Sequence, residues 1–271
     1  PSSNFCIADW GAESHYLGNQ EGTREWGPRV IRQPADWARL PILDPHAGLL
    51  GEMGRALHGI GREVGEEVPF LMTVFSPLAQ AKNLAGERLL SDLRQHPDAL
   101  KSGLETITQT ILRTIEAQRG SGVAGIFLAL QHASYDLLSE AEYAEFGRPY
   151  DLRILEAAQG FWFNLLHLHG SHVMFDLVAD YPVHVINWAD RETKPSLAEA
   201  RKMTKRALAG GLSLSTLLSG TPADVKAQAH HAIAQAGRKG FILAPACVIK
   251  GPSPDANLAA ARKAVEEIAQ S

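Results

Sequence analysis

Apolar runs alternate with amphipathic stretches along most of the chain. Six runs have the length and apolar content of buried strands, at residues 69–76, 122–131, 162–170, 183–188, 208–213 and 240–247. Polar and apolar positions recur with a helical period at 47–64, 96–119, 139–160, 174–179, 196–206, from 221 onward and at 253–268. This alternation predicts an α/β fold in which helices cover a parallel sheet.

Four of the predicted helices begin with a recognisable cap, at Ser139, Ser196, Thr221 and Ser253. Ser139 is followed three residues later by Glu142, the spacing of a capping box. Ser196 caps the helix over 196–206, which we expect to end in the basic cluster of residues 201–206, where cations suit the negative end of a helix.

Two architectures fit six strand–helix units in order. One is an open, doubly wound sheet, and the other is a (β/α)8 barrel of which six units are recognised. Ser76, Pro77 and Leu78 follow the first strand, where a nucleotide-binding sheet carries a glycine-rich phosphate loop. The sequence therefore disfavours a nucleotide-binding sheet.

Composition narrows the class of protein further. The 271 residues are 45% hydrophobic and 21% charged, which is typical of a globular domain, and the net charge of −4 gives no general attraction to nucleic acid or anionic membranes. The longest apolar stretch, 123–130, is far shorter than the ~20 residues that cross a bilayer. Cys6 and Cys247 allow at most one disulfide. We expect a cytoplasmic protein without nucleic-acid or membrane partners.

Polar side chains gather where the predicted strands end. In both architectures the carboxyl ends of parallel strands carry the functional groups. The residues at these ends are Ser76, Asn83, Gln131, His132, Ser134, His167, His169, Ser171, His172, Asn187, Trp188, Asp190, Arg191, Ser213, Ser215, Cys247 and Lys250.

The sharpest local feature is His167-Leu168-His169. Residues two apart on a strand point to the same face, so both imidazoles can reach one metal ion, with Cys247 from a later strand end as a third ligand. Zinc accepts such mixed nitrogen and sulfur ligation and leaves one position open in three-ligand sites. The alternative is a pair of hydrogen-bonded histidines in a polar barrel mouth.

Other strand-end residues have equally plausible structural explanations. His132 follows a buried strand and is either a general acid/base or a buried structural histidine. Asn187 and Asp190 either orient a ligand or form a turn after their strand.

Several motifs together resemble the uroporphyrinogen decarboxylase superfamily. The resemblance extends from about residue 30 to the C-terminus and is clearest after Ser215. The matching segments are 34–40, 68–70 with 76–77, 143–150, 217–225, 240–247 and 253–258.

This resemblance implies a (β/α)8 barrel, with residues 1–271 as a single domain. Such a barrel needs eight units against the six recognised here, and the chain begins at Pro1 without Met. We therefore expect an absent N-terminal segment that carries one or two early elements. The structure should show either a barrel gap filled by residues 1–30 or an incomplete barrel wall.

The superfamily holds two chemistries. One is cofactor-free decarboxylation of uroporphyrinogen, and the other is zinc-dependent methyl transfer between a methylated corrinoid and a thiol. Against the decarboxylase pattern, Asn83 stands at a Tyr position, Gln131 at a Ser position before a matching His132, and Cys247 at a late His position. The decarboxylases' arginine-bearing loop and catalytic Asp would lie upstream of this chain.

The methyltransferase pattern has a His-x-Cys motif and a distant Cys that bind zinc. His167 and Cys247 match it, and His169 replaces the middle Cys. The resemblance thus implies a zinc site that is more positive by one charge, because neutral imidazole replaces thiolate.

The leading hypothesis is therefore zinc-dependent methyl transfer to a thiol, with zinc on His167, His169 and Cys247. The residues expected to act in catalysis or to contact the substrate are His132, Asp190, Gln131, Asn187, Asn83, Arg148 and Trp188. Expected partners are a small thiol, corrinoid or tetrapyrrole and a corrinoid protein, with a homodimer left open.

Two alternatives remain. One is a decarboxylase of uroporphyrinogen or a related polycarboxylate, which would use Arg148, Arg191 and Lys250 to hold carboxylates. The other is a non-catalytic barrel that binds a tetrapyrrole or corrinoid.

Overall fold

The computed structural model describes residues 5–16, 18–20, 24–64 and 67–270. Residues 1–4, including Pro1, lie outside them. The chain divides into two compact units. The first unit comprises Pro1–Leu17, Arg24–His132 and Leu138–Leu165, and the second comprises Gly18–Thr23, Ala133–Leu137 and Leu166–Ser271.

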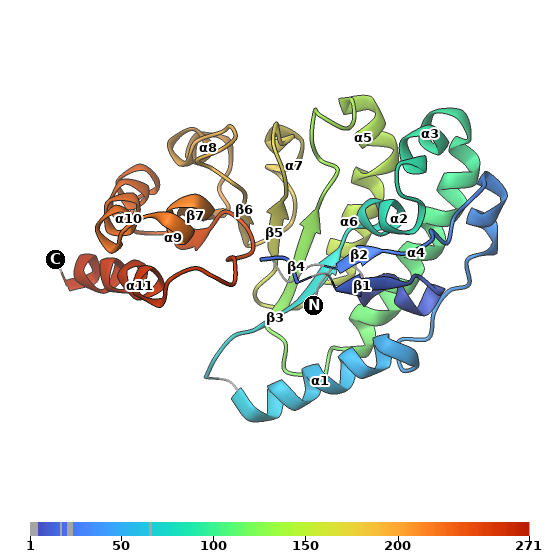
Figure 1. Cartoon of the computed structure of the whole chain (residues 1–271), viewed down its shortest axis with the longest axis horizontal. Helices are drawn as coiled ribbons and strands as arrows, with labels where there is room; N and C mark the ends of the chain where they lie inside the picture. The colour runs from blue at the N-terminus through green and yellow to red at the C-terminus, as the bar shows by residue number, and fades with distance from the viewer. Residues whose placement is uncertain (1–4, 17, 21–23, 65–66, 271) are drawn as a thin grey trace. The chain divides into compact units, whose positions relative to one another are not determined.

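The first unit contains one pair of parallel strands together with several helices (Figure 1). Strands β3 and β4 run parallel, with Leu71 opposite Gly125, and β1 and β2 form a short antiparallel pair. The elements are η1 (Phe5–Trp10), β1 (Ser14–Tyr16), β2 (Arg24–Trp26), η2 (Pro34–Arg39), α1 (Gly48–Val64), β3 (Leu71–Phe75), α2 (Pro77–Ala85), α3 (Arg88–Gln95), α4 (Pro97–Ala117), β4 (Gly125–Leu130), α5 (Glu140–Phe146) and α6 (Arg148–Ala157).

The second unit repeats the strand–helix alternation. Strand β6 pairs with β7 and β7 with β8, both in parallel, with Leu208 opposite Phe241 in the second pair. Its elements are most of β5 (Leu165–Leu168), α7 (Phe175–Val178), β6 (Val185–Asn187), α8 (Leu197–Met203), β7 (Ala207–Leu212), α9 (Leu214–Ser219), α10 (Pro222–Ala236), β8 (Phe241–Pro245) and α11 (Asp255–Gln270).

All six predicted strands are present as β3 to β8. Five of them are three to five residues shorter than their apolar runs, and β7 has the predicted length but begins and ends one residue earlier. Each is followed by at least one helix, so the described residues provide six β/α units. This is the α/β class that the alternation predicts, and it corresponds to part of a (β/α)8 barrel. Among the described residues, none of the helices combines the length and apolarity needed to span a bilayer.

The prediction of one continuous helix over residues 139–160 is wrong. The segment forms two helices, α5 and α6, which meet at Gly147. Pro149 explains the break, because proline lacks the N–H that would continue the helix and its ring clashes with the preceding turn. The Tyr143 hydroxyl donates to Asp151 Oδ2 at 2.7 Å and ties the two helices together.

The prediction that a helix ends in the basic cluster of residues 201–206 is correct for Arg201 and Lys202 but wrong for the rest of the cluster. Helix α8 ends at Met203, so Lys205 and Arg206 follow it. The Arg201 guanidinium donates to the carbonyls of Ala236, the last residue of α10, and of Gly240, which precedes β8, instead of to its own helix end. This cation therefore joins three elements of the second unit.

Helices α2, α3 and α9 are present without having been predicted from the sequence pattern. Helix α2 has a clear local signal, since the Ser76 hydroxyl accepts from the Ala79 N–H at 3.2 Å and Pro77 occupies its first turn. Helix α3 contributes Asp92, which is fully buried and accepts a hydrogen bond from Trp37 Nε1 at 2.8 Å.

The core of the first unit is closely packed around Trp37. This side chain is completely buried on η2, and a Cβ added at Gly103 of α4 would lie 2.3 Å from its ring. In the second unit α10 packs against α11 over a cluster that includes Leu217, Val225 and Ala264 (Figure 1). Each unit therefore has its own apolar interior.

We predict that Gly103→Ala destabilises the protein by about 1–2 kcal/mol, because overpacking against Trp37 outweighs the gain in helix propensity. Gly59→Ala is the matched control, since a Cβ there meets no atom within 4 Å and alanine favours the helix interior. Urea unfolding measures both changes. A gain in stability for both variants would contradict the packing described here.

Candidate functional site

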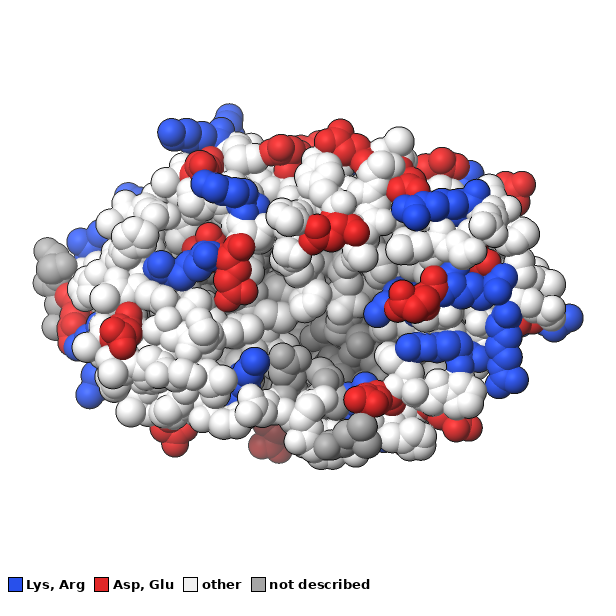
Figure 2. All heavy atoms as spheres, turned by 45° about the horizontal axis from the view of Figure 1, so that its top comes forward, with Lys and Arg blue, Asp and Glu red and all other residues white. Residues whose placement is uncertain are grey.

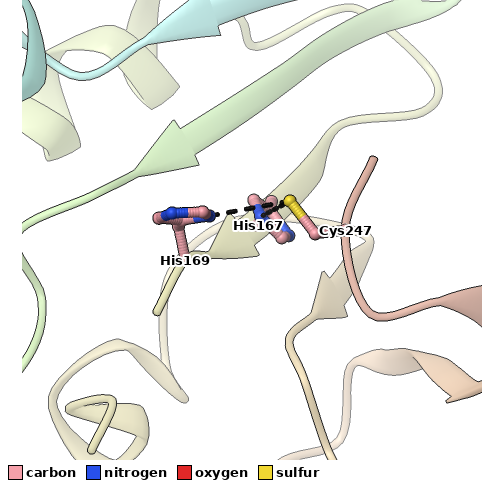
Figure 3. Close-up of side chains that lie close together, drawn as sticks. All are labelled: His167, His169 and Cys247. Carbon is pink, nitrogen blue, oxygen red and sulfur yellow. Dashed lines mark hydrogen bonds between the residues drawn. The ribbon is translucent and has the colours of Figure 1, made fainter. Parts of the chain in front are cut away.

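Three potential metal ligands lie together in the second unit. His167 is on β5, His169 follows that strand directly, and Cys247 follows β8 (Figure 3). Their ligand atoms all lie within 4.8 Å of one another, and Cys247 Sγ is 3.6 Å from both His167 Nε2 and His169 Nδ1. The i, i+2 spacing on β5 brings the two imidazoles to one side, as predicted.

Asn187, at the end of β6, orients His167. The Asn187 Nδ2 amide donates to the carbonyls of Ala209 and Pro245, at 3.0 and 3.3 Å, so its Oδ1 is the atom that faces His167. His167 Nδ1 lies 2.6 Å from this oxygen and must donate to it. The proton therefore sits on Nδ1, and the lone pair of Nε2 faces Cys247.

Burial keeps His167 in its neutral form. Loss of solvent lowers the pKa of His167 from 6.5 to about 4, opposed by its bond to Asn187, and the nearby His169 lowers it further. Exposure increases across the cluster, from buried His167 through half-buried Cys247 to exposed His169. One side of the cluster is therefore open to solvent.

The donor set and the two sulfur–nitrogen distances suit a three-ligand zinc site. Zinc binds cysteine sulfur at ~2.3 Å and histidine nitrogen at ~2.0–2.1 Å, so tetrahedral ligation places sulfur and nitrogen about 3.5 Å apart. Both sulfur–nitrogen distances here are 3.6 Å. A neutral imidazole whose other nitrogen is held by an amide oxygen is also the form that binds metals. The three residues can therefore hold one zinc ion with a fourth position open.

Asp190 and Arg191 are engaged with the backbone of β7 and α10. Asp190 Oδ1 accepts from the Gly211 N–H at 2.7 Å, and burial raises the pKa of this carboxyl. Arg191 donates through Nε to the Gly211 carbonyl and through Nη2 to the Gln228 carbonyl. A Cβ at Gly210 would lie 2.4 Å from Asp190 Oδ1, so the paired glycines of β7 make this approach possible. Both charged side chains thus have structural partners.

Trp188 does not offer a surface to a substrate, contrary to prediction. It is completely buried, its Nε1 donates to the Pro195 carbonyl at 2.8 Å, and its ring meets Phe175 edge-on at 4.8 Å. Because its ring is buried and its indole N–H has a hydrogen-bond partner, Trp188 belongs to the core.

The remaining predicted residues belong to the first unit. Gln131 and His132 follow β4, and His132 is buried. Asn83 is buried on α2, and its backbone carbonyl accepts a hydrogen bond from Arg29 Nη1 at 2.8 Å. Arg148 is the first residue of α6. Their proposed contacts with a substrate stay predictions.

A second polar group in the second unit joins the predicted strand-end residues Ser171 and His172 to Asp136, which the sequence did not indicate. Asp136 accepts from Ser171 Oγ at 2.5 Å and lies 2.6 Å from His172 Nδ1, and these hydrogen bonds lower the pKa of Asp136. His172 has a positive φ of 43°, which is uncommon for a non-glycine residue. Ser171 and His172 line a cavity of about 760 Å³. Asp136 carries no sequence signal, because its partners are 35 residues away.

Comparison with known proteins assigns the family. The sequence profile named uroporphyrinogen decarboxylase (URO-D) matches residues 20–268, and the chain belongs to this family. A search of curated proteins gives no significant match.

Two solved structures are similar to the chain. A methyltransferase from Methanosarcina mazei superposes with a TM-score of 0.86 at 21% identity, over 98% of this chain and 78% of that one. A B12-independent methionine synthase from Shewanella sp. W3-18-1, in complex with selenomethionine, superposes with a TM-score of 0.63 at 11% identity, over 95% of this chain and 74% of that one. At these identities the likenesses establish the fold, and they confirm the predicted fold class.

We predict that folding stability falls by about 2 kcal/mol between pH 7.5 and pH 5 through His167 alone. The folded pKa of about 4 lies below the ordinary 6.5, so the unfolded chain takes up the proton first as the pH falls. This contribution is complete above pH 6.5 and is lost toward pH 4. Urea unfolding of chelator-treated protein measures it, and His167→Gln should remove that part of the dependence. An identical pH dependence in both proteins would refute it.

Proposed function

We propose that this protein is a zinc-dependent methyltransferase that acts on a thiol acceptor. The observation that carries the proposal is the cluster of His167, His169 and Cys247, whose two sulfur–nitrogen distances of 3.6 Å suit tetrahedral zinc ligation. When bound, zinc supplies a Lewis acid that favours ionisation of a thiol at its open position.

The residues of the chain have distinct parts in this proposal. Cys247 provides the anionic ligand, and His167 and His169 provide neutral ones. Asn187 holds His167 with its Nε2 lone pair toward the sulfur. The exposed side at His169 is where an acceptor thiol would reach the site.

Methyl transfer is supported by more than the cluster. Family membership restricts the chemistry to that of the superfamily, and two structures with this fold are named as a methyltransferase and a methionine synthase. We propose a methylated corrinoid, on a small molecule or a carrier protein, as the methyl donor. This choice rests on the resemblance of the His-x-His and Cys247 pattern to corrinoid methyltransferases.

Decarboxylation is less well supported by the described residues. It requires cations free to hold carboxylates and to stabilise developing negative charge. Arg191, one of the expected cations, is bound to two backbone carbonyls of the second unit. The family to which the chain belongs is named after this decarboxylase, so decarboxylation stays the second candidate.

The first test is metal content with turnover. We expect about one zinc per chain and methyl transfer from methylcobalamin to at least one of a panel of small thiols. His167→Ala and Cys247→Ser should each lose metal and activity, whereas His231→Ala, an exposed histidine on α10, should change neither. Elemental analysis and a thiol-methylation assay measure these outcomes.

The same preparation separates the alternatives. Zinc-free protein that remains active, or His167→Ala with unchanged turnover, would refute the proposed mechanism. Release of CO₂ from uroporphyrinogen would instead establish the decarboxylase, and tetrapyrrole or corrinoid binding without any turnover would indicate the binding barrel.

A second prediction concerns His169, which stands where the related methyltransferases have cysteine. His169→Cys should retain metal, because it supplies a thiolate at the same position, whereas His169→Ala should weaken binding at least about tenfold. The cobalt-substituted variant should show stronger thiolate-to-metal charge-transfer absorption than the wild type. Unchanged absorption would show that residue 169 is not a ligand.

The charge of residue 169 should also affect the pKa and nucleophilicity of the acceptor thiol. A thiolate in place of imidazole makes the site more negative by one charge, which raises the pKa of a bound acceptor thiol and its intrinsic nucleophilicity. The pH–rate profile of His169→Cys should therefore shift toward higher pH than that of the wild type.

A further inference from the structure

A cationic hollow lies beside α1 in the first unit, independent of the metal-ligand cluster. Its volume is about 510 Å³, and Arg55, His58, Arg62, His46 and Gln118 contribute to its lining. Arg55, His58 and Arg62 follow one another at helical spacings of three and four residues, so they share one face of α1. That face presents two guanidinium groups and an imidazole to the same space.

The charges in this hollow are not neutralised within the described part of the chain. The residues that line it include no carboxylate, and neither Arg55 nor Arg62 forms an ion pair with a described residue. Other arginines of the same unit, such as Arg94 and Arg153, are paired with glutamates. Figure 2 shows this intermingling of opposite charges on the face that it draws. A carboxylate-free cationic hollow favours an anionic ligand, all the more in a chain of net charge −4.

Gln118 supplies a second and independent indication of a ligand. It is 2% exposed and lines the hollow, yet its Oε1 has no hydrogen-bond partner among the described residues. Gly54 gives the amide room, since a Cβ there would lie 2.7 Å from Gln118 Nε2. The local turn uses only the Gln118 backbone, whose carbonyl accepts from Ser121 Oγ at 2.7 Å. A buried acceptor without a donor costs free energy that a ligand bearing an O–H would recover.

His58 is fixed on the same face. Its Nδ1 lies 2.9 Å from the Gly54 carbonyl, which can only accept, so Nδ1 carries a proton. This bond holds the imidazole against α1 beside the two arginines.

We propose that this hollow is a binding site for a phosphate-bearing ligand. Arg55 and Arg62 provide charge-assisted donors to the phosphoryl oxygens, as guanidinium groups do in phosphate recognition. Gln118 Oε1 accepts a hydrogen bond from a phosphoryl O–H. A sulfate dianion has similar size and charge but no such proton, so the site distinguishes phosphate from sulfate through Gln118.

The test compares inorganic phosphate, sulfate and glycerol phosphate by calorimetric titration of the full chain at pH 6.5. We expect saturable binding of phosphate that is tighter than that of sulfate. The double variant Arg55→Gln, Arg62→Gln should bind phosphate at least about tenfold more weakly. Arg113→Gln, an exposed arginine of α4 outside the hollow, is the matched control and should bind as the wild type does.

The Gln118→Leu variant tests the acceptor separately. It should bind phosphate and sulfate equally, because the arginines remain and the proton-accepting oxygen is gone. Tighter binding of glycerol phosphate than of phosphate would identify an ester as the ligand, and weaker binding would identify the free ion.

Three outcomes would overturn the proposal. They are the absence of saturable phosphate binding, equal weakening in Arg113→Gln and in the double variant, and equal wild-type affinity for phosphate and sulfate. Circular dichroism of each variant establishes that it is folded. None of these results depends on zinc or on methyl transfer.

Discussion

The candidate metal cluster depends on one hydrogen bond, from His167 Nδ1 to Asn187 Oδ1. The amide of Asn187 can orient in only one way, because its Nδ2 already donates to the Ala209 carbonyl within β7 and to the Pro245 carbonyl at the end of β8. The strand carbonyls thus fix the orientation of the Asn187 amide, and the amide in turn fixes the orientation of the His167 imidazole. The position of the Nε2 lone pair is therefore set by the strands themselves.

Most of the fold could be predicted from the sequence, because its strands are apolar runs and its helices are amphipathic. The errors arise where a local signal competes with the periodicity. Pro149 breaks a helix whose polar and apolar pattern continues across it. The place of Trp188 after an apolar strand predicts a pocket residue, yet its burial depends on Phe175 and Pro195, which no periodicity relates to it.

The site was predicted unevenly for a similar reason. The pairing of His167 with His169 follows from strand geometry alone, and Cys247 from the order of strand ends. The sequence indicates that Asn187 and Asp190 either orient a ligand or form a turn, whereas in the structure Asn187 Oδ1 faces the His167 imidazole and Asp190 Oδ1 accepts from the Gly211 N–H of the neighbouring strand. Such contacts depend on register, which a single sequence does not specify. The weak strand signal at Gly210 and Gly211 reflects the space that Asp190 occupies.

The unequal exposure of the three cluster residues has a kinetic consequence for any metal held there. Exposed His169 can exchange with solvent or with a chelator while buried His167 and half-buried Cys247 still hold the ion. Loading and release should therefore proceed stepwise, with the outermost imidazole as the first bond to open and the last to close. Because exposure rises from His167 to His169, ligand exchange at a bound metal would begin on the His169 side of the cluster.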